Sequence, residues 1–255
     1  MVRVALAPCS PFSVTKQLMS DSARLAERLD VRLHTHFAEN DEDDAYSIAT
    51  FGCRPTEYLE EVGWVSDRVW LAHCAKPNDD EIKRLGAARV GVAHCPSSNL
   101  ILSSGIAPTV KLRSAGVHVG IGVDGSSSAD SASLWLEARQ AMLLAKLSSG
   151  AAAGTARMAL EMATRGGAGC LGRVGEIGEL SVGSTGDLVV WSLEGPQFAG
   201  VVDDPIEGWL RCGPTSAKHT VVHGKTVVRD HELVSGRLSE MLRDQDRKST
   251  RLNSS

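Results

Sequence analysis

Three histidines and one aspartate close four successive apolar segments of this sequence. They are His36 in the run Val31–Phe37, His73 after Val69–Ala72, His94 after Val90–Ala93, and Asp124 after Val117–Val123. One such histidine is more often structural than a metal ligand, but polar residues at four successive strand ends are difficult to attribute to packing. Converging imidazole and carboxylate groups form metal sites with open positions for water. Glu39 lies one short turn beyond His36, close enough to transfer a proton for such a water.

These side chains can meet only if the segments that contain them are neighbouring parallel strands. The predicted strands are Val2–Ala7, Val31–Phe37, Val69–Ala72, Val90–Ala93 and Val117–Val123. Helical patterns lie between and after them, with an apolar face from Val14 to Leu29, helix starts at Pro55 and Asn78, and helices over Ile106–Ala115, Leu134–Leu147 and Thr155–Ala163. Strands that alternate with helices form right-handed β/α units. In a (β/α)8 barrel of the TIM type, the carboxyl ends of the strands share one face. We therefore expect an α/β fold of this kind.

The pattern changes near Gly166–Gly169. Beyond this point, short apolar runs at 187–192 and 220–228 are separated by glycine turns, which predicts β strands and no strong helix before Leu238–Arg243. We predict a barrel portion over residues 1–170, a small β domain over 171–235, and a terminal helix with a polar tail over 236–255. The tail from residue 248 is polar and aperiodic. It is interpreted either as disordered or as a segment that does not belong to the natural protein.

The composition excludes several classes of function. The chain has 31 acidic and 27 basic residues, a net charge of -4, and so no electrostatic footprint for nucleic acid or an anionic membrane. No apolar run approaches the ~20 residues of a membrane helix, and the N-terminal stretch is too short for a signal peptide. The six cysteines form no C-x-x-C pair and are expected to be free, mostly buried thiols. A cytoplasmic location is expected.

Competing chemistries find little support in the motifs. The signatures of cytidine deaminases, P-loop proteins and G-x-S-x-G hydrolases are absent. The acidic run Asp41–Asp44 lacks the ligand spacing and the glycine of a calcium-binding loop, so we predict a solvated turn there.

Several motifs along the chain form a specific set. They are Ala7-Pro-Cys-Ser-Pro-Phe-Ser-Val14, Leu33-His-Thr-His-Phe-Ala-Glu39, Ala72-His-Cys74, Val92-Ala-His-Cys-Pro-Ser-Ser-Asn99, Ser104-Gly105, Gly120-Ile-Gly-Val-Asp-Gly125, Thr185-Gly-Asp-Leu-Val-Val-Trp191 and Val222-His-Gly224. This set resembles the metal-dependent amidohydrolase superfamily, in its branch of aromatic-base and triazine deaminases. The segment Pro8–Phe12 points to the 8-oxoguanine branch. The resemblance implies hydrolysis of an exocyclic amine of an oxidised purine, with release of ammonia through a metal-activated water.

The resemblance also implies roles for individual residues. His36 would be the metal ligand of the fifth barrel strand, and Glu39 would pass the proton of the attacking water to the base ring. His73 would orient the water or polarise the substrate. Asp124 would bind the metal and take the second proton for the departing ammonia. One divalent metal ion is expected, and zinc is the metal that we predict. Histidine and aspartate ligands do not distinguish it from Fe²⁺, because both ions accept them.

Four further residues are expected to bind substrate. The strand-seven motif contributes His94 and Asn99, and the loop after the fourth barrel strand contributes Cys9 and Phe12. The expected partner is a small heterocyclic molecule, with no nucleic acid or membrane, and the parent enzyme is a candidate homo-oligomer.

Residue counting predicts that the chain begins in the middle of a barrel. Family members take two more ligands from an H-x-H motif on their first strand, which the pair His34 and His36 imitates. Only 88 residues separate His36 from Asp124, enough for three β/α units of about 30 residues each, whereas seven would separate strands one and eight. His36 is therefore assigned to strand five, and the chain to strands four to eight. Since only His36 and Asp124 remain of the four ligands that the resemblance implies, the chain by itself is expected to bind metal poorly and to be inactive. A triazine or related heterocycle aminohydrolase and an inactive fragment are the alternatives.

Overall fold

The computed structural model describes residues 2–201 and 203–252, and the chain divides into two compact units. The first unit spans Met1–Glu179 and the second spans Leu180–Ser255. The sequence patterns predict the boundary after residue 170, and the structure has it after Glu179. Each unit is described by itself.

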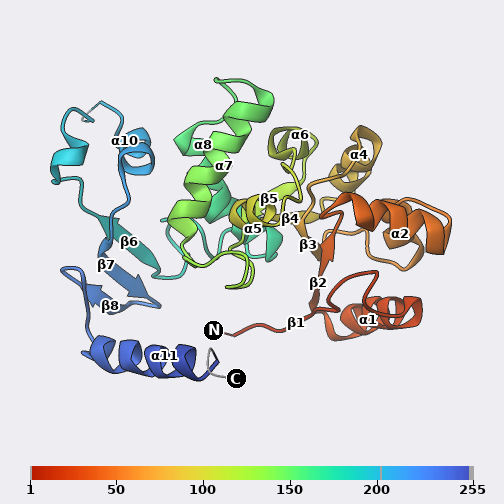
Figure 1. Cartoon of the computed structure of the whole chain (residues 1–255), viewed down its shortest axis with the longest axis horizontal. Coiled ribbons are helices and arrows are strands. Elements are labelled where there is room, and N and C mark those ends of the chain that lie inside the picture. The colour runs from red at the N-terminus through yellow and green to blue at the C-terminus, as the bar shows by residue number, and fades with distance from the viewer. Residues whose placement is uncertain (1, 202, 253–255) are drawn as a thin grey trace. The chain divides into compact units, whose positions relative to one another are not determined.

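A parallel sheet of five strands forms the centre of the first unit, and its strands are neighbours in chain order. The strands are β1 (Ala5–Leu6), β2 (Arg32–Phe37), β3 (Val69–His73), β4 (Gly91–His94) and β5 (His118–Ile121). Every adjacent pair is parallel, and Figure 1 shows β2 to β5 following one another in this order. The predicted strand order is confirmed. The carboxyl ends of the strands therefore lie at one edge of the sheet.

Helices connect and follow these strands. They are α1 (Lys16–Leu29), α2 (Asp41–Phe51), α3 (Pro55–Glu61), α4 (Asp79–Ala87), α5 (Pro96–Ile101), α6 (Thr109–Ser114), α7 (Leu134–Ser149), α8 (Ala156–Glu161), the π-helical η1 (Met162–Gly166) and α9 (Gly167–Cys170). The predicted solvated turn at residues 41–44 is wrong, because these acidic residues form the first turn of α2. The Asn40 side chain caps this helix by accepting a hydrogen bond from the Asp43 N–H at 3.0 Å. Acidic side chains are stabilising there because the N-terminus of a helix has partial positive charge.

Buried and half-buried side chains alternate along β2, and this alternation places its two histidines on one face of the strand. Leu33, Thr35 and Phe37 are buried, with at most 2% exposure. The side chains of Leu33 and Phe37 belong to the main hydrophobic cluster. Burying each of these two side chains contributes roughly 1.5–3 kcal/mol to folding. Because side chains alternate along a strand, His34 and His36 lie together on the opposite, half-buried face.

The segment after α8 packs unusually close to the sheet. A Cβ added at Gly166 in η1 would lie 2.0 Å from the carbonyl oxygen of Val119 in β5. Only glycine permits this approach of a helix to a strand, which explains Gly166. Gly169 is explained in the same way, because a Cβ there would lie 2.6 Å from Nδ1 of His118.

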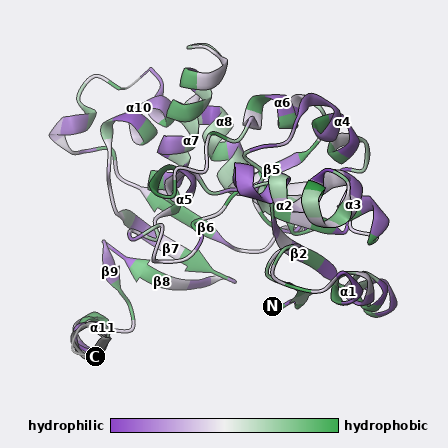
Figure 2. Cartoon of the chain, turned by 45° about the vertical axis from the view of Figure 1, so that its right-hand side comes forward, coloured by the Kyte–Doolittle hydropathy of each residue, from purple (hydrophilic) through white to green (hydrophobic). Residues whose placement is uncertain are grey.

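The second unit contains an antiparallel sheet, in agreement with the predicted β module. Its strands, in the order β6-β7-β8-β9, are β6 (Leu188–Trp191), β7 (Ala217–Val222), β8 (Lys225–Arg229) and β9 (Glu232–Leu233). Hydrophobic residues appear green along β8 in Figure 2, beside hydrophilic residues of the same strand. The short helix η2 (Pro196–Phe198) follows β6.

Two helices complete the second unit. The helix α10 (Pro205–Cys212) was not expected there; Asp204 caps it, and Trp209 packs against Trp191 with ring centroids 5.5 Å apart. The terminal helix α11 (Leu238–Leu252) is longer than expected and extends into the segment expected to be an aperiodic tail, whose residues 253–255 lie outside the described part of the chain. Within residues 2–201 and 203–252, no helix combines the length and hydropathy needed to cross a bilayer.

Candidate metal centre

Three predicted site residues meet at the carboxyl edge of the parallel sheet. Ligand atoms of His36, His73 and Asp124 all lie within 4.8 Å of one another. His36 is the second-last residue of β2, His73 ends β3, and Asp124 lies just past β5. The rings of the two histidines are stacked, with centroids 5.3 Å apart.

A backbone carbonyl holds the His36 ring. Nδ1 of His36 lies 2.5 Å from the carbonyl oxygen of Cys9, in the loop that follows β1. A carbonyl can only accept a hydrogen bond, so the ring proton is on Nδ1 and the lone pair of Nε2 is left for a ligand. The same carbonyl accepts the His36 N–H at 3.0 Å and the Thr35 hydroxyl at 3.2 Å. Cys9 therefore contacts the His36 ring through its backbone carbonyl, and its Sγ lies 4.0 Å from Nδ1 of the same ring.

The His73 ring is buried and fixed by Asn99. Nδ1 of His73 lies 2.9 Å from Oδ1 of Asn99, and the residue is 1% exposed. Its Nε2 therefore faces the other site residues, at 3.7 Å from Oε2 of Glu39 and 3.9 Å from Oδ2 of Asp124. The backbone of His73 is left-handed, with φ 67°. Such strain in a residue other than glycine is typical of functional sites.

Serine hydroxyls surround the carboxylate of Asp124. Its Oδ2 accepts a hydrogen bond from Ser98 at 2.6 Å and lies 3.3 Å from the hydroxyl of Ser128. Burial raises the pKa of Asp124, but the hydrogen bonds from Ser98 and the Gly125 N–H, with the charge of His73, outweigh it and hold the pKa below its usual value. The carboxylate is therefore ionised near neutral pH. Like His73, Asp124 has a left-handed backbone, with φ 62°.

Glu39 is held at both its backbone and its side chain. The Asp43 carboxylate in α2 accepts the backbone N–H of Glu39 at 2.8 Å. The hydroxyl of Ser104 lies 3.4 Å from Oε1 of Glu39, and the side chain is 16% exposed. This arrangement leaves Oε2 facing His73.

Two other histidines lie outside the cluster. His34 stacks on Trp70 with ring centroids 4.7 Å apart, and its Nδ1 lies 3.0 Å from the Trp70 carbonyl oxygen. This gives it a structural partner, in agreement with its treatment as a neighbour of the ligands. His94 is 1% exposed, and burial, followed by the charge of His73, lowers its pKa to about 4. His94 is therefore neutral at pH 7.

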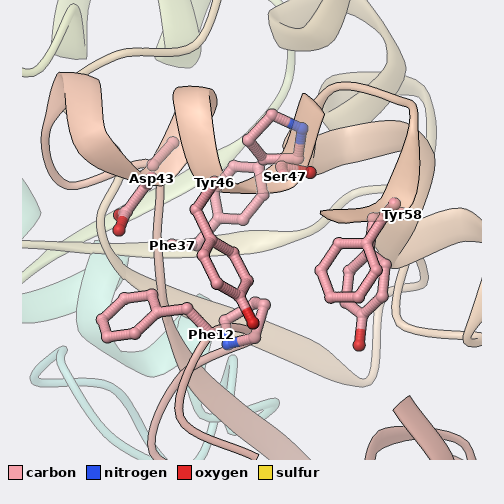
Figure 3. A pocket seen from close by; sticks show the side chains of 10 residues that line it. Phe12, Phe37, Asp43, Tyr46, Ser47 and Tyr58 are labelled. Atoms are coloured by element: carbon pink, nitrogen blue, oxygen red, sulfur yellow. The ribbon is translucent and has the colours of Figure 1, made fainter. Parts of the chain in front are cut away.

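Phe12 lies in a separate aromatic pocket. The pocket is lined by Pro11, Phe12, Phe37, Ala38, Asp43, Tyr46, Ser47, Phe51, Pro55 and Tyr58. Figure 3 shows the Phe12 ring beside Tyr46, and the two rings meet edge to face with centroids 6.3 Å apart. None of the three clustered residues lines this pocket. Asp43 links the two places, because it lines the pocket and binds the backbone of Glu39.

The chemistry of the donor set fits a divalent metal. Two imidazoles with their Nδ1 atoms bound elsewhere and one ionised carboxylate provide three protein ligands. Three protein ligands with a position left for water are typical of catalytic zinc sites. His36, His73 and Asp124 would hold such an ion. The sequence analysis expected only His36 and Asp124 as ligands, with His73 directed at the water or the substrate, and the geometry adds His73 to the possible ligands.

Sequence reasoning missed the residues that support the ligands. Ser98, Ser104, Ser128 and Asp43 contact site side chains or backbone. Ser98 and Ser104 lie inside motifs that the sequence singled out, but no spacing rule distinguishes a serine that binds a ligand from its neighbours.

The chain is similar in sequence and in structure to several known proteins. The chain is 48% identical over 229 residues to the 8-oxoguanine deaminase of Pseudomonas aeruginosa, which covers 90% of this chain and 51% of that protein. A zinc-bound crystal structure of an adenosine deaminase from Xanthomonas campestris superposes with a TM-score of 0.93 at 30% identity, covering 98% of this chain and 57% of that one. The zinc complex of atrazine chlorohydrolase from Arthrobacter aurescens TC1 gives a TM-score of 0.90 at 38% identity, covering 96% and 54%.

The chain spans about half the length of the curated relatives it matches. The profile described as the Amidohydrolase family matches residues 1–227, which includes the whole parallel sheet and all of the clustered residues. The chain belongs to the amidohydrolase family.

Proposed function

We propose that this chain serves the metal-dependent hydrolytic deamination of a nitrogen heterocycle, as the strand-four-to-eight part of a barrel. The observation that supports this most directly is the convergence of His36, His73 and Asp124 beside Glu39. The proposed substrate is an oxidised purine of the 8-oxoguanine type. The 48% identity to an 8-oxoguanine deaminase supports that choice.

The ligand atoms lie close enough together to bind one divalent ion. Zinc is proposed because structures of relatives contain it. When bound, such an ion supplies Lewis acidity that makes water a nucleophile near neutral pH. The Cys9 carbonyl and Asn99 keep the protons of His36 and His73 on Nδ1, so that Nε2 of each ring is available. Hydrogen bonds to Asp124 keep its carboxylate ionised.

Two carboxylates handle the protons of the reaction. Hydrolysis joins the water oxygen to a ring carbon, breaks the exocyclic C–N bond and releases ammonia, so both water protons must be transferred. Glu39, with Oε2 facing His73 at 3.7 Å, accepts the first and gives it to a ring nitrogen. Asp124 accepts the second and gives it to the leaving amine.

The remaining predicted residues are proposed to contact the substrate, a small heterocyclic molecule. Cys9 and Asn99 touch the ligands directly, at the His36 and His73 rings. His94 is buried near the same strand ends, and its neutral ring makes it a hydrogen-bonding group rather than a charge. Phe12 would act from the aromatic pocket beside Asp43.

The test combines metal analysis with an activity assay on the whole chain. After loading with zinc, bound metal is measured by elemental analysis, and ammonia release is followed with 8-oxoguanine and with a hydroxylated triazine. The sequence alone predicts that the chain by itself binds metal poorly and is inactive. Because three ligands converge in the structure, we expect instead stoichiometric zinc, its loss in His36→Ala, and release from 8-oxoguanine. Release from the triazine alone would favour the triazine hydrolase alternative. Bound zinc without release from either compound would overturn the deaminase proposal and favour an inactive metal-binding chain.

A further inference from the structure

One short helix contacts two of the three candidate ligands. Within α5, the hydroxyl of Ser98 donates to Asp124 at 2.6 Å, and Oδ1 of the next residue, Asn99, accepts the proton of His73 Nδ1 at 2.9 Å. Both α5 residues are fully buried, with at most 1% exposure. The orientation of Asp124 and His73 therefore depends on where α5 lies.

The position of α5 is set from outside the centre. Its N-cap residue, Cys95, makes no side-chain capping bond. Instead, the backbone N–H of Ser97 donates to Oε2 of Glu137 in α7 at 2.9 Å. One helical turn further along α7, the side chain of Gln140 donates to the Ser97 hydroxyl, also at 2.9 Å. The long helix α7 thus binds the start of α5 through two hydrogen bonds to one residue, Ser97.

Glu137 destabilises the fold if its only role is to pack in the interior. Its side chain is 0% exposed, and its Oε1 has no hydrogen-bond partner. Among the described residues, 2–201 and 203–252, no ion pair with Lys, Arg or His neutralises it. A buried carboxylate is costly unless it is paired, and an apolar side chain of similar size would avoid that cost. A charge-assisted bond to a backbone amide is strong and directional. The role of Glu137 is therefore to fix the position of α5 rather than to stabilise the fold.

We propose that Glu137 is a positioning residue for the metal centre: through Ser97 it fixes α5, so that Ser98 and Asn99 hold Asp124 and His73 in a geometry that binds the ion. Glu137 contacts neither ligand itself. This inference rests on the proposed metal site.

The test measures metal binding by the full chain, without an activity assay. Zinc affinity is obtained by competition with a chromophoric chelator, and Co²⁺ absorption bands report the ligand geometry. Outer contacts of metal ligands typically contribute 10–100-fold to affinity. We therefore expect Glu137→Leu to weaken zinc binding by about 10-fold or more and to change the Co²⁺ spectrum. Glu137→Gln keeps an acceptor oxygen for Ser97 and should restore most of the affinity and the original spectrum.

Glu81 provides a matched control. It is also a buried carboxylate, 2% exposed, and it accepts the backbone N–H of Asn78 at 2.9 Å at the start of α4. Unlike Glu137, it also forms an ion pair with Arg54 at 2.8 Å. No residue that it contacts is bonded to a candidate ligand. Glu81→Leu is expected to lower the urea midpoint while leaving zinc affinity and the Co²⁺ spectrum unchanged.

Two additional variants keep the result interpretable. Glu137→Asp retains the charge but is one methylene too short for the Ser97 bond, so it replaces the leucine variant if that chain does not fold. Because Glu137 acts through α5, its substitution and Ser98→Ala should be less than additive in zinc affinity.

The failure of this inference differs from the failure of the proposed function. If His36→Ala abolishes zinc binding but Glu137→Leu and Glu137→Asp bind zinc with the original affinity and Co²⁺ spectrum, the positioning role is overturned and the metal site stands. If the unsubstituted chain does not bind zinc through His36, the metal site and the inference resting on it both fall.

Discussion

Buried His94 should make the stability of this chain sensitive to mild acid. Burial, followed by the charge of His73, lowers its pKa to about 4 in the folded chain, against about 6.5 when unfolded. Below pH 6.5 the unfolded chain therefore binds the proton more readily, so the stability is complete above that pH and declines as the pH falls toward 4. At 1.36 kcal/mol per pKa unit, the loss approaches about 3 kcal/mol near pH 4 and is about 2 kcal/mol near pH 5.

The variant His94→Leu isolates this effect. Nδ1 of His94 has no hydrogen-bond partner in the structure, so leucine removes the titrating group without removing a bond at that atom. Urea unfolding of both chains is followed by far-UV circular dichroism at about pH 7 and about pH 5, with a chelator present to exclude metal effects. Other titrating groups are common to both chains. The free energy of unfolding of the unsubstituted chain should fall by about 2 kcal/mol more than that of the variant. Parallel losses in the two chains would show that His94 is not held neutral by burial, and would refute this reasoning.

Three other substitutions test the core and the centre. Trp64 is fully buried and its Nε1 donates to the Met19 carbonyl at 2.8 Å, so Trp64→Phe should lower the free energy of unfolding by about 1–3 kcal/mol, measured with urea. Asp124→Asn removes the charged donor and should weaken zinc binding by about 10-fold or more in a chelator competition; unchanged affinity would exclude Asp124 as a ligand. Glu39→Gln should leave zinc bound but lower kcat for ammonia release by about 10²–10⁴-fold in an active preparation. Near-normal turnover would assign the proton transfer to another group.

The order of the parallel strands could be predicted because it depends on alternation along the chain. Apolar runs separated by helical patterns permit few topologies, and the polar residues at their ends must share an edge. The same logic brought His36, His73 and Asp124 together before any coordinates. It failed at α2, where a run of acidic residues suggested a turn although Asn40 was present as a capping signal. It also failed at α10, where Asp204 and Pro205 mark a helix start within a region of β pattern.

The supporting contacts could not be predicted, for a different reason. Ser98 and Ser128 reach Asp124 because of backbone geometry after β4 and β5, and no periodicity encodes that geometry. Glu137 looks like any polar residue of an amphipathic helix, and only its complete burial distinguishes it. The left-handed backbone of His73 could not be predicted either, since few residues other than glycine adopt that region and no pattern in the sequence marks which ones do.

The left-handed backbone opposes stability to function unequally at the two positions. At φ 67° and 62°, glycine would relieve a strain of roughly 1–2 kcal/mol at His73 or Asp124, less what it costs in the entropy of the unfolded chain. At His73 this gain is smaller than the roughly 2–5 kcal/mol lost by deleting a buried ring that is bonded to Asn99. A library of variants selected for thermal stability in a chelator should therefore retain the histidine, and glycine can gain ground only at Asp124, whose side chain is partly exposed.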